Sequence, residues 1–149
     1  MKKRLLALCL VAILLCLNAC SMKVQDDTFY IPREKVVSVE MQKEYKEDGK
    51  DSYYCKKEIT SSVDLDKICS MIRDLPAKKA SSEHPNPIEE AKIIVILHGQ
   101  KDHRLILNEK MAFYDQVAYE YTDDDVTNRF LKFYDGVDCQ EEKTTPSYY

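Results

Sequence analysis

The sequence predicts a two-layer α+β domain, in which a mainly antiparallel five-stranded sheet carries two helices on one face. Several segments alternate apolar and polar residues, as strands with one buried face do, and turn signals separate them. Two other segments repeat apolar residues at helical spacing. The order of these elements along the chain is ββαβββα. Strands linked as hairpins form an antiparallel sheet. The apolar stripes of both helices are then expected to be buried against one face of this sheet, which gives a two-layer domain.

The first two strands are expected to form a hairpin. Residues 36–44 alternate, with Val37, Val39 and Met41 on one side and polar residues on the other. The run KEDGKDS that follows is centred on Asp-Gly, a dipeptide that favours a tight hairpin turn. Residues 53–59 then form the returning strand.

Two helices are predicted from their ends and their apolar stripes. In TSSVDLDKICSMIRDLP, Ser61 and Asp64 have the spacing of a capping box, and Pro76 stops the helix. A second helix follows Thr122 and Asp125 and ends at Gly136. The first stripe consists of Leu65, Ile68, Cys69, Ile72 and Leu75, and the second of Val126, Phe130 and Phe133.

A long polar connection at residues 77–90 precedes three strands, at residues 91–98, 103–107 and 111–121. The first of these strands is apolar on both faces, so both faces must be covered. With an even-length loop GQKD, the face expected beneath the helices consists of Ile94, Ile96, Leu105, Leu107, Met111 and Phe113. The opposite face, a candidate binding face, consists of Ile93, Val95, Leu97, Arg104, Ile106, Ala112 and Tyr114. The alternative is that the chain covers this face itself, with residues 29–31 or with the C-terminal tail.

The N-terminal segment predicts export and lipid attachment. A basic start at residues 2–4 precedes thirteen apolar residues, 5–17, fewer than the roughly 20 that a bilayer-spanning helix needs. This run ends in LNAC, which looks like a bacterial lipobox with cleavage between Ala19 and Cys20. A diacylglyceryl group on Cys20 would supply two acyl chains, and two chains anchor stably where one binds only marginally. The alternatives are a secreted protein cut near Ala19 and an uncleaved membrane anchor.

The expected organisation is a signal peptide (1–19), a lipidated N-terminus and tether (20–29), a single α+β domain (30–136) and a flexible tail (137–149). Cleavage removes three basic and no acidic residues, which takes the formal net charge from −4 to −7. An acidic chain without basic clusters argues against nucleic acid as a partner, and against a polybasic membrane contact. Membrane attachment is therefore assigned to the lipid on Cys20, at the extracytoplasmic face.

Three segments of the chain resemble an uncharacterised domain family of Firmicutes lipoproteins. They are FYIPREKVVSVEM at residues 29–41, EITSSVDLDKICSMIRDL at 58–75, and KKASSEHPNP at 78–87. The similarity covers most of the chain after the lipobox. It implies a Gram-positive cell surface and a domain of unknown function, and it supplies no catalytic residues.

His98, His103 and Asp115 are candidate metal ligands. An even-length GQKD loop makes the two histidines cross-strand neighbours, and a three-residue NEK loop places Asp115 opposite His103. Two imidazoles and a carboxylate are a legitimate ligand set for zinc, nickel or cobalt. A shift of one residue in register would separate them, and the alternative is a polar cluster at the end of the sheet.

The remaining candidates favour structural roles. The serines at 81–82 near His84 lie in a Pro-rich loop that lacks the G-x-S-x-G turn of a hydrolase. The aspartates at 123–125 lack the alternating oxygen ligands of a calcium loop, and they fit a helix start. After lipidation of Cys20, three thiols are left and at most one intramolecular disulfide can form. These thiols are Cys55, Cys69 and Cys139, of which the first two are expected in the core.

We therefore expect a membrane-anchored extracytoplasmic lipoprotein whose domain binds an envelope protein, a peptide or a small ligand. No cofactor and no catalytic residue is assigned. Two alternatives stay open: an envelope enzyme, either a hydrolase or a metal-dependent enzyme, and a tethered inhibitor of an extracellular enzyme.

Overall fold

The computed structural model of the chain describes residues 33–81 and 90–147. The predicted signal peptide and tether, and most of the 77–90 connection, lie outside these residues. The elements are a short 3-10 helix η2 (Arg33–Lys35), β1 (Val36–Tyr45), β2 (Tyr53–Ile59), α2 (Ser62–Arg73), β3 (Ala77–Lys79), β4 (Ile93–Gly99), β5 (His103–Leu107), β6 (Met111–Tyr114), β7 (Val117–Tyr121), α3 (Val126–Gly136) and β8 (Glu141–Thr144).

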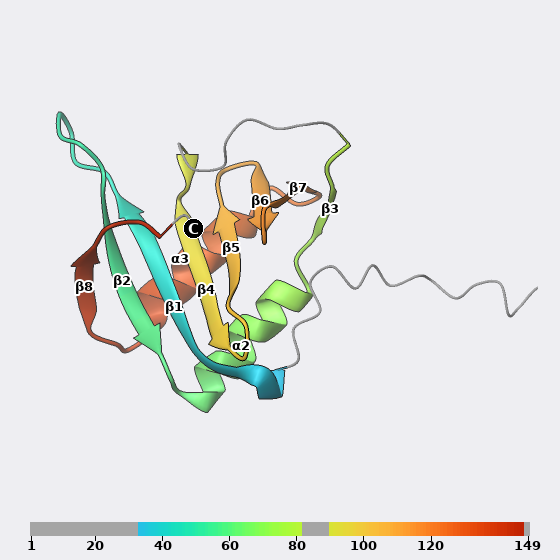
Figure 1. Cartoon of the computed structure of the whole chain (residues 1–149). Helices are drawn as coiled ribbons and strands as arrows, with labels where there is room; N and C mark the ends of the chain where they lie inside the picture. Colours follow the sequence, from blue (N-terminus) through green and yellow to red (C-terminus); the bar gives the residue numbers. More distant parts are fainter. Residues whose placement is uncertain (1–32, 82–89, 148–149) are drawn as a thin grey trace, which may run out of the picture.

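The strands form one sheet in the order β3-β7-β6-β5-β4-β1-β2-β8, with every neighbouring pair antiparallel. Both helices lie behind this sheet in Figure 1, and their apolar residues join one core with one face of the sheet. The predicted α+β class is confirmed. The predicted five strands and the order ββαβββα are wrong, because the described chain has eight strands in the order ββαβββββαβ.

One extra strand arises because residues 111–121, predicted as a single strand, fold back on themselves. Asp115 and Gln116 adopt positive φ angles of 46° and 75°, which gives a tight turn between β6 and β7. Residues other than glycine adopt this left-handed conformation uncommonly, so the sequence pattern does not mark the turn. The Asp115 side chain stabilises the turn, because its Oδ1 atom accepts a hydrogen bond from the Arg104 N–H at 2.9 Å.

A second extra strand lies in the connection that was predicted as a loop. Ala77–Lys79 pairs with β7 and forms one edge of the sheet. Two of its three residues, Lys78 and Lys79, are exposed lysines. A short charged edge strand carries no alternating apolar pattern, and it resists pairing with other chains.

The C-terminal tail, predicted to be flexible, contains strand β8 and contacts the sheet as far as Ser147. β8 pairs with β2, and the chain then turns back across β2 and β1 (Figure 1). There the Ser147 N–H donates to Gln42 Oε1 at 2.9 Å, and Gln42 Nε2 donates to Ser147 Oγ at 3.0 Å. The sequence EEKT of β8 is charged throughout, so strand pairing could not be predicted from its composition.

The predicted helices are both present, but their predicted capping is wrong. Ser61 is the N-cap of α2 and Asp125 the N-cap of α3, and neither side chain makes a capping hydrogen bond. The helices are instead held by their apolar stripes, since Leu65, Ile68 and Phe130 are buried against the sheet. Tertiary packing supplies most of the stability of short helices, so a missing cap is tolerated.

The doubly apolar β4 strand is confirmed, but the predicted assignment of its faces is reversed. Ile94 pairs with Ile106 and Val95 with Leu105, so five residues (98–102) separate the paired Leu97 and His103 instead of an even number. Because the number of intervening residues is odd instead of even, the side chains of β4 lie on the face opposite to the one predicted for them. The helix-covered face contains Ile93, Val95, Leu97, Leu105, Leu107, Ala112 and Tyr114. The opposite face contains Tyr54, Ala91, Ile94, Ile96, Ile106 and Phe113, which are also buried.

An irregularity at the start of β1 changes which valine is buried. The β1–β4 register shifts between Val36 and Ser38, as in a β-bulge. Val36 is therefore only 6% exposed, whereas Val37, predicted to face the core, is 74% exposed. The shift also places the beginning of β1 against Gly99 at the end of β4.

Candidate functional site

The predicted set of three metal ligands is not formed. His103 Nδ1 lies 2.7 Å from Asp115 Oδ2. The predicted register is nevertheless wrong by one residue, because Leu105 pairs with Tyr114 and Asp115 therefore lies opposite Arg104 instead of His103. His98 is not the cross-strand partner of His103, and its Nδ1 lies 3.1 Å from Asp102 Oδ2 instead. Within residues 33–81 and 90–147, no group of three histidine, cysteine or acidic residues is placed to hold a metal ion.

The His103 ring is held in one orientation. Its plane stacks on Tyr114 with the ring centroids 5.8 Å apart, while Asp115 bonds its Nδ1 atom. Burial raises the pKa of the Tyr114 phenol above its ordinary value. The Nε2 atom of His103 is left without a hydrogen-bond partner among the described residues, and the same holds for Nε2 of His98.

Both histidines nevertheless line one pocket of about 200 Å³, which we call the hairpin pocket. It lies where β4 ends and the chain enters β1. A Cβ atom at Gly99 would collide with the Lys35 carbonyl oxygen, so the absence of a side chain at Gly99 lets η2 approach the β4–β5 loop. The pocket is lined by Lys35, Val36, Leu97, His98, Gly99, Gln100, Lys101 and His103.

The free polar side-chain groups of the hairpin pocket are mostly cations or potential cations. Lys35 and Lys101 are exposed, and neither has an ion-pair partner within the part of the chain that the structure describes. The nearby carboxylates, Asp102 and Asp115, are already bonded to the two histidines. The residues that line the pocket thus include two lysines and two histidines. Alternation along the strands puts the His98 and His103 side chains on opposite faces of the sheet, because His103 pairs with Leu97.

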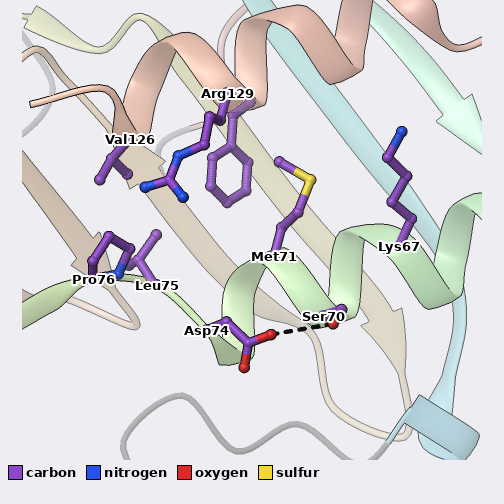
Figure 2. Close-up of a pocket in the computed structure, with 9 residues that line it drawn as sticks. Lys67, Ser70, Met71, Asp74, Leu75, Pro76, Val126 and Arg129 are labelled. Carbon is purple, nitrogen blue, oxygen red and sulfur yellow. Dashed lines mark hydrogen bonds between the residues drawn. The ribbon is translucent and has the colours of Figure 1, made fainter. Parts of the chain in front are cut away.

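A larger hollow of about 310 Å³ lies between α2 and α3 (Figure 2). Figure 2 shows Met71 from α2 and Arg129 from α3 reaching into the space between the helices. The apolar residues that line it are Met71, Leu75, Pro76, Val126 and Phe130. It has the apolar lining typical of a small-molecule site.

The polar residues around this second hollow are already engaged. Arg129 pairs with Asp123 at 2.9 Å, and Ser70 donates to Asp74 at 3.3 Å. The Lys67 ammonium lies over the Phe133 ring, 5.2 Å from its centroid. A ligand would have to displace these contacts to gain a polar anchor, so the hairpin pocket is the better candidate site.

The predicted binding face does not exist as one surface. Five of its seven residues belong to the core beneath the helices: Ile93, Val95, Leu97, Ala112 and Tyr114. The other two, Arg104 and Ile106, lie on the opposite face, because Arg104 pairs with Ile96 and Ile106 with Ile94. The Arg104 Nε atom is buried without a hydrogen-bond partner among the described residues.

Sequence reasoning found His103 and Asp115 but missed the lysines of the pocket. Lys35 meets the β4–β5 loop across 64 positions of the chain, and nothing in the local pattern marks that contact. Lys101 lies in the predicted GQKD loop, and the loop pattern predicts only a turn there. A basic residue in a loop is usually solvated, so its role depends on the three-dimensional neighbours.

The three described thiols are free, with Cys55 and Cys69 buried and Cys139 partly exposed. Burial raises the pKa of the Cys55 and Cys69 thiols, which lowers the fraction of reactive thiolate at neutral pH. The prediction that Cys55 and Cys69 lie in the core is confirmed. Cys20, the predicted lipid-attachment residue, lies outside the described residues.

We expect Cys139 to react first when the native protein is treated with a bulky maleimide. Only its sulfur combines partial exposure with a position past the last helix. Mass spectrometry of peptides after timed labelling would rank the three rates, and Cys139→Ser would serve as the control. Modification of Cys69 ahead of Cys139 would contradict the burial of the α2 stripe.

Among the helices of residues 33–81 and 90–147, neither combines the length and apolar composition that crossing a bilayer requires. Comparisons of the chain with protein-family models, with curated proteins and with solved structures find no match. The functional proposal therefore depends on this chain's own residues.

Proposed function

We propose that the chain is a lipid-anchored extracytoplasmic protein whose α+β domain is a binding module. The observation that carries the anchor is LNAC at residues 17–20, directly after a basic start and a thirteen-residue apolar run. The described domain begins at Arg33, 13 residues after Cys20. A flexible segment of that length has a root-mean-square reach of about 20 Å, so the domain would be held close to the bilayer.

The hairpin pocket supports binding as the role of the domain. Two lysines without an ion-pair partner among the described residues line it, Lys35 from η2 and Lys101 from the β4–β5 loop, and the ends of β4 and β5 add His98 and His103. No serine, threonine or cysteine stands among the described residues that line it, so the pocket supplies donors and charge without a hydroxyl or thiol nucleophile. A small hollow lined by a few polar residues is typical of a ligand site.

Replacing Cys20 with serine is expected to move the protein out of the membrane fraction, or to leave an uncleaved precursor of higher mass. Serine lacks the thiol that receives the diacylglyceryl group, so both acyl chains would be lost. Immunoblots of membrane, soluble and medium fractions would measure the change. Cys16→Ser is a matched control, because this cysteine would leave with the signal peptide. A Cys20→Ser protein of mature size that stays in the membrane would contradict the anchor.

An envelope enzyme is the second candidate, and the His103–Asp115 pair favours it. A carboxylate that holds Nδ1 of a histidine leaves Nε2 as a general base, as in many hydrolases. Turnover of an ester, amide or phosphoester panel that is lost in His103→Gln would indicate this enzyme. Stoichiometric inhibition of an extracellular hydrolase would indicate the tethered inhibitor instead.

A further inference from the structure

We propose that the sheet face opposite the helices is a binding site for an uncharged, extended peptide segment of a partner protein, and that residues 145–147 of the chain occupy this site until the partner displaces them. The site is centred on Gln42 of β1. It is separate from the hairpin pocket, so this inference goes beyond the proposed function and is tested independently of it.

The first argument is the way in which the tail lies on this face. After β8 the chain turns back across β2 and β1, and residues 145–147 belong to no strand (Figure 1). Ser147 makes two hydrogen bonds with the Gln42 amide, at 2.9 and 3.0 Å, while Thr145 is exposed and Pro146 is partly exposed. A short segment with few buried contacts opens at a low free-energy cost, so the tail can leave while the sheet stays folded.

The second argument is the chemistry of Gln42, which is fully buried. Its Oε1 atom accepts the backbone N–H of Ser147, and its Nε2 atom donates to Ser147 Oγ. Nε2 also donates to Glu40 Oε1 at 2.6 Å, which fixes the orientation of the amide. Any extended segment offers a backbone N–H, and a serine or threonine adds the hydroxyl. Departure of the tail leaves Oε1 without this donor, and a bound segment restores it.

The third argument is the charge on this part of the face. Lys56 is paired with Glu40 at 3.2 Å, and Lys92 is paired with Glu44 at 2.9 Å, so the charged side chains already neutralise each other. Charged residues make up 32% of the chain, yet residues 144–149 contain none. An uncharged segment covers this face without burying an unpaired charge, and a charged segment would lose hydration that nothing here replaces.

The fourth argument is the surface that lies beyond Gln42. Ile94 is the cross-strand partner of Gln42, Ile106 is the partner of Ile94, and Phe113 is the partner of Ile106. This apolar row continues across the strands in the direction that the tail takes from β2 to β1. We therefore expect the partner segment to carry apolar or aromatic residues after the one that contacts Gln42. In this chain the two residues after Ser147 are tyrosines, which lie outside the described residues.

The decisive test opens the site in the chain that begins at residue 21, which retains every described residue and carries no lipid. Ser147→Pro removes both the N–H and the hydroxyl that contact Gln42. The probe is a fluorescent peptide with the sequence of residues 144–149, TTPSYY, and binding is measured by fluorescence anisotropy. We expect saturable binding to the Ser147→Pro chain, at least about tenfold tighter than to the unsubstituted chain, in which the attached tail competes.

Matched variants separate this contact from other effects. Thr145→Ala changes an exposed residue of the same segment, so it should leave peptide binding as weak as in the unsubstituted chain. A peptide with proline in place of its serine should not bind, whereas a peptide with alanine there should bind with intermediate affinity because it keeps the N–H. Gln42→Leu in the opened chain should abolish the difference between the serine and alanine peptides.

Two results would overturn the proposal. One is the absence of saturable binding to a Ser147→Pro chain that circular dichroism shows to be folded. The other is equal binding of the serine and proline peptides, which are also compared on the unsubstituted chain, so that this result does not depend on the folding of a variant. A dimer of the unsubstituted chain that Ser147→Pro converts to a monomer would replace the partner protein by a second copy. The Cys20→Ser fractionation tests the anchor alone and is unaffected by any of these results.

Discussion

Replacement of Lys57 by methionine should lower the free energy of unfolding by about 2–3 kcal/mol, because this buried lysine of β2 caps the C-terminal end of α3. Its Nζ atom donates to the carbonyl oxygens of Tyr134 and Val137, each at 2.9 Å, and it lies 4.9 Å from the Tyr134 ring centroid. The side chain is on β2 and only 8% of the residue is exposed. Methionine fills a similar volume but leaves both carbonyls at the helix end without this donor.

Chemical denaturation followed by circular dichroism would measure the loss at Lys57. Lys56→Met is the matched control, since Lys56 is the adjacent residue on β2 and makes a partly exposed ion pair with Glu40 at 3.2 Å. Pairs of that kind contribute at most about 1 kcal/mol, so the control should be close to the unsubstituted protein. Equal stability of Lys57→Met and Lys56→Met would contradict a role for Lys57 in capping α3.

Ending the chain at Thr144 should expose part of the sheet face opposite the helices. Gln42 is fully buried on this face, and its amide exchanges two hydrogen bonds with Ser147. Its cross-strand partner on the same face is the buried Ile94. Loss of residues 145–149 removes both hydrogen bonds to Ser147 and leaves the Gln42 Nε2 bond to Glu40 Oε1 at 2.6 Å. We expect a cost of about 1–3 kcal/mol together with increased binding of a hydrophobic dye.

Dye fluorescence and thermal unfolding of the shortened chain would measure this effect. Ser147→Ala provides the control, because it removes the hydroxyl acceptor but keeps the backbone N–H that donates to Gln42. Its effect should be the smaller of the two. A shortened chain with unchanged dye binding and unfolding temperature would show that the tail does not protect this face.

The helices and strands that could be predicted from the sequence are those with a repeating apolar pattern. The bounds of β2 and β5 agree with the predicted residues 53–59 and 103–107, and both helices lie where their stripes place them. β8 could not be found in this way, because EEKT joins the sheet through backbone hydrogen bonds and has no apolar side chain to bury. The turn at Asp115 and Gln116 was missed because it uses left-handed residues other than glycine.

The site was predictable only where it depends on local pairing. The proximity of His103 and Asp115 was expected from the β5–β6 hairpin. The predicted register was wrong by one residue, because Asp115 lies opposite Arg104 and contacts His103 through its side chain. His98 was misplaced because the number of residues in the β4–β5 loop sets which face each side chain occupies, and a single residue reverses it. Lys35 was missed because its place depends on the contact of η2 with Gly99, which is a tertiary feature.

The position of β8 has a consequence for the order in which the chain can fold. Thr144 pairs with Tyr54, so the outer edge of β2 can form its interstrand hydrogen bonds only when a segment 90 residues further along the chain is present. Synthesis proceeds from the N-terminus, and β2 therefore leaves the ribosome long before β8, its neighbour on this edge, has been made. Until the last residues emerge, the N–H and C=O groups of that edge have no partner and can pair with another chain. Completion of the sheet is therefore a late event, and nascent or C-terminally cut chains should be the species most prone to aggregate.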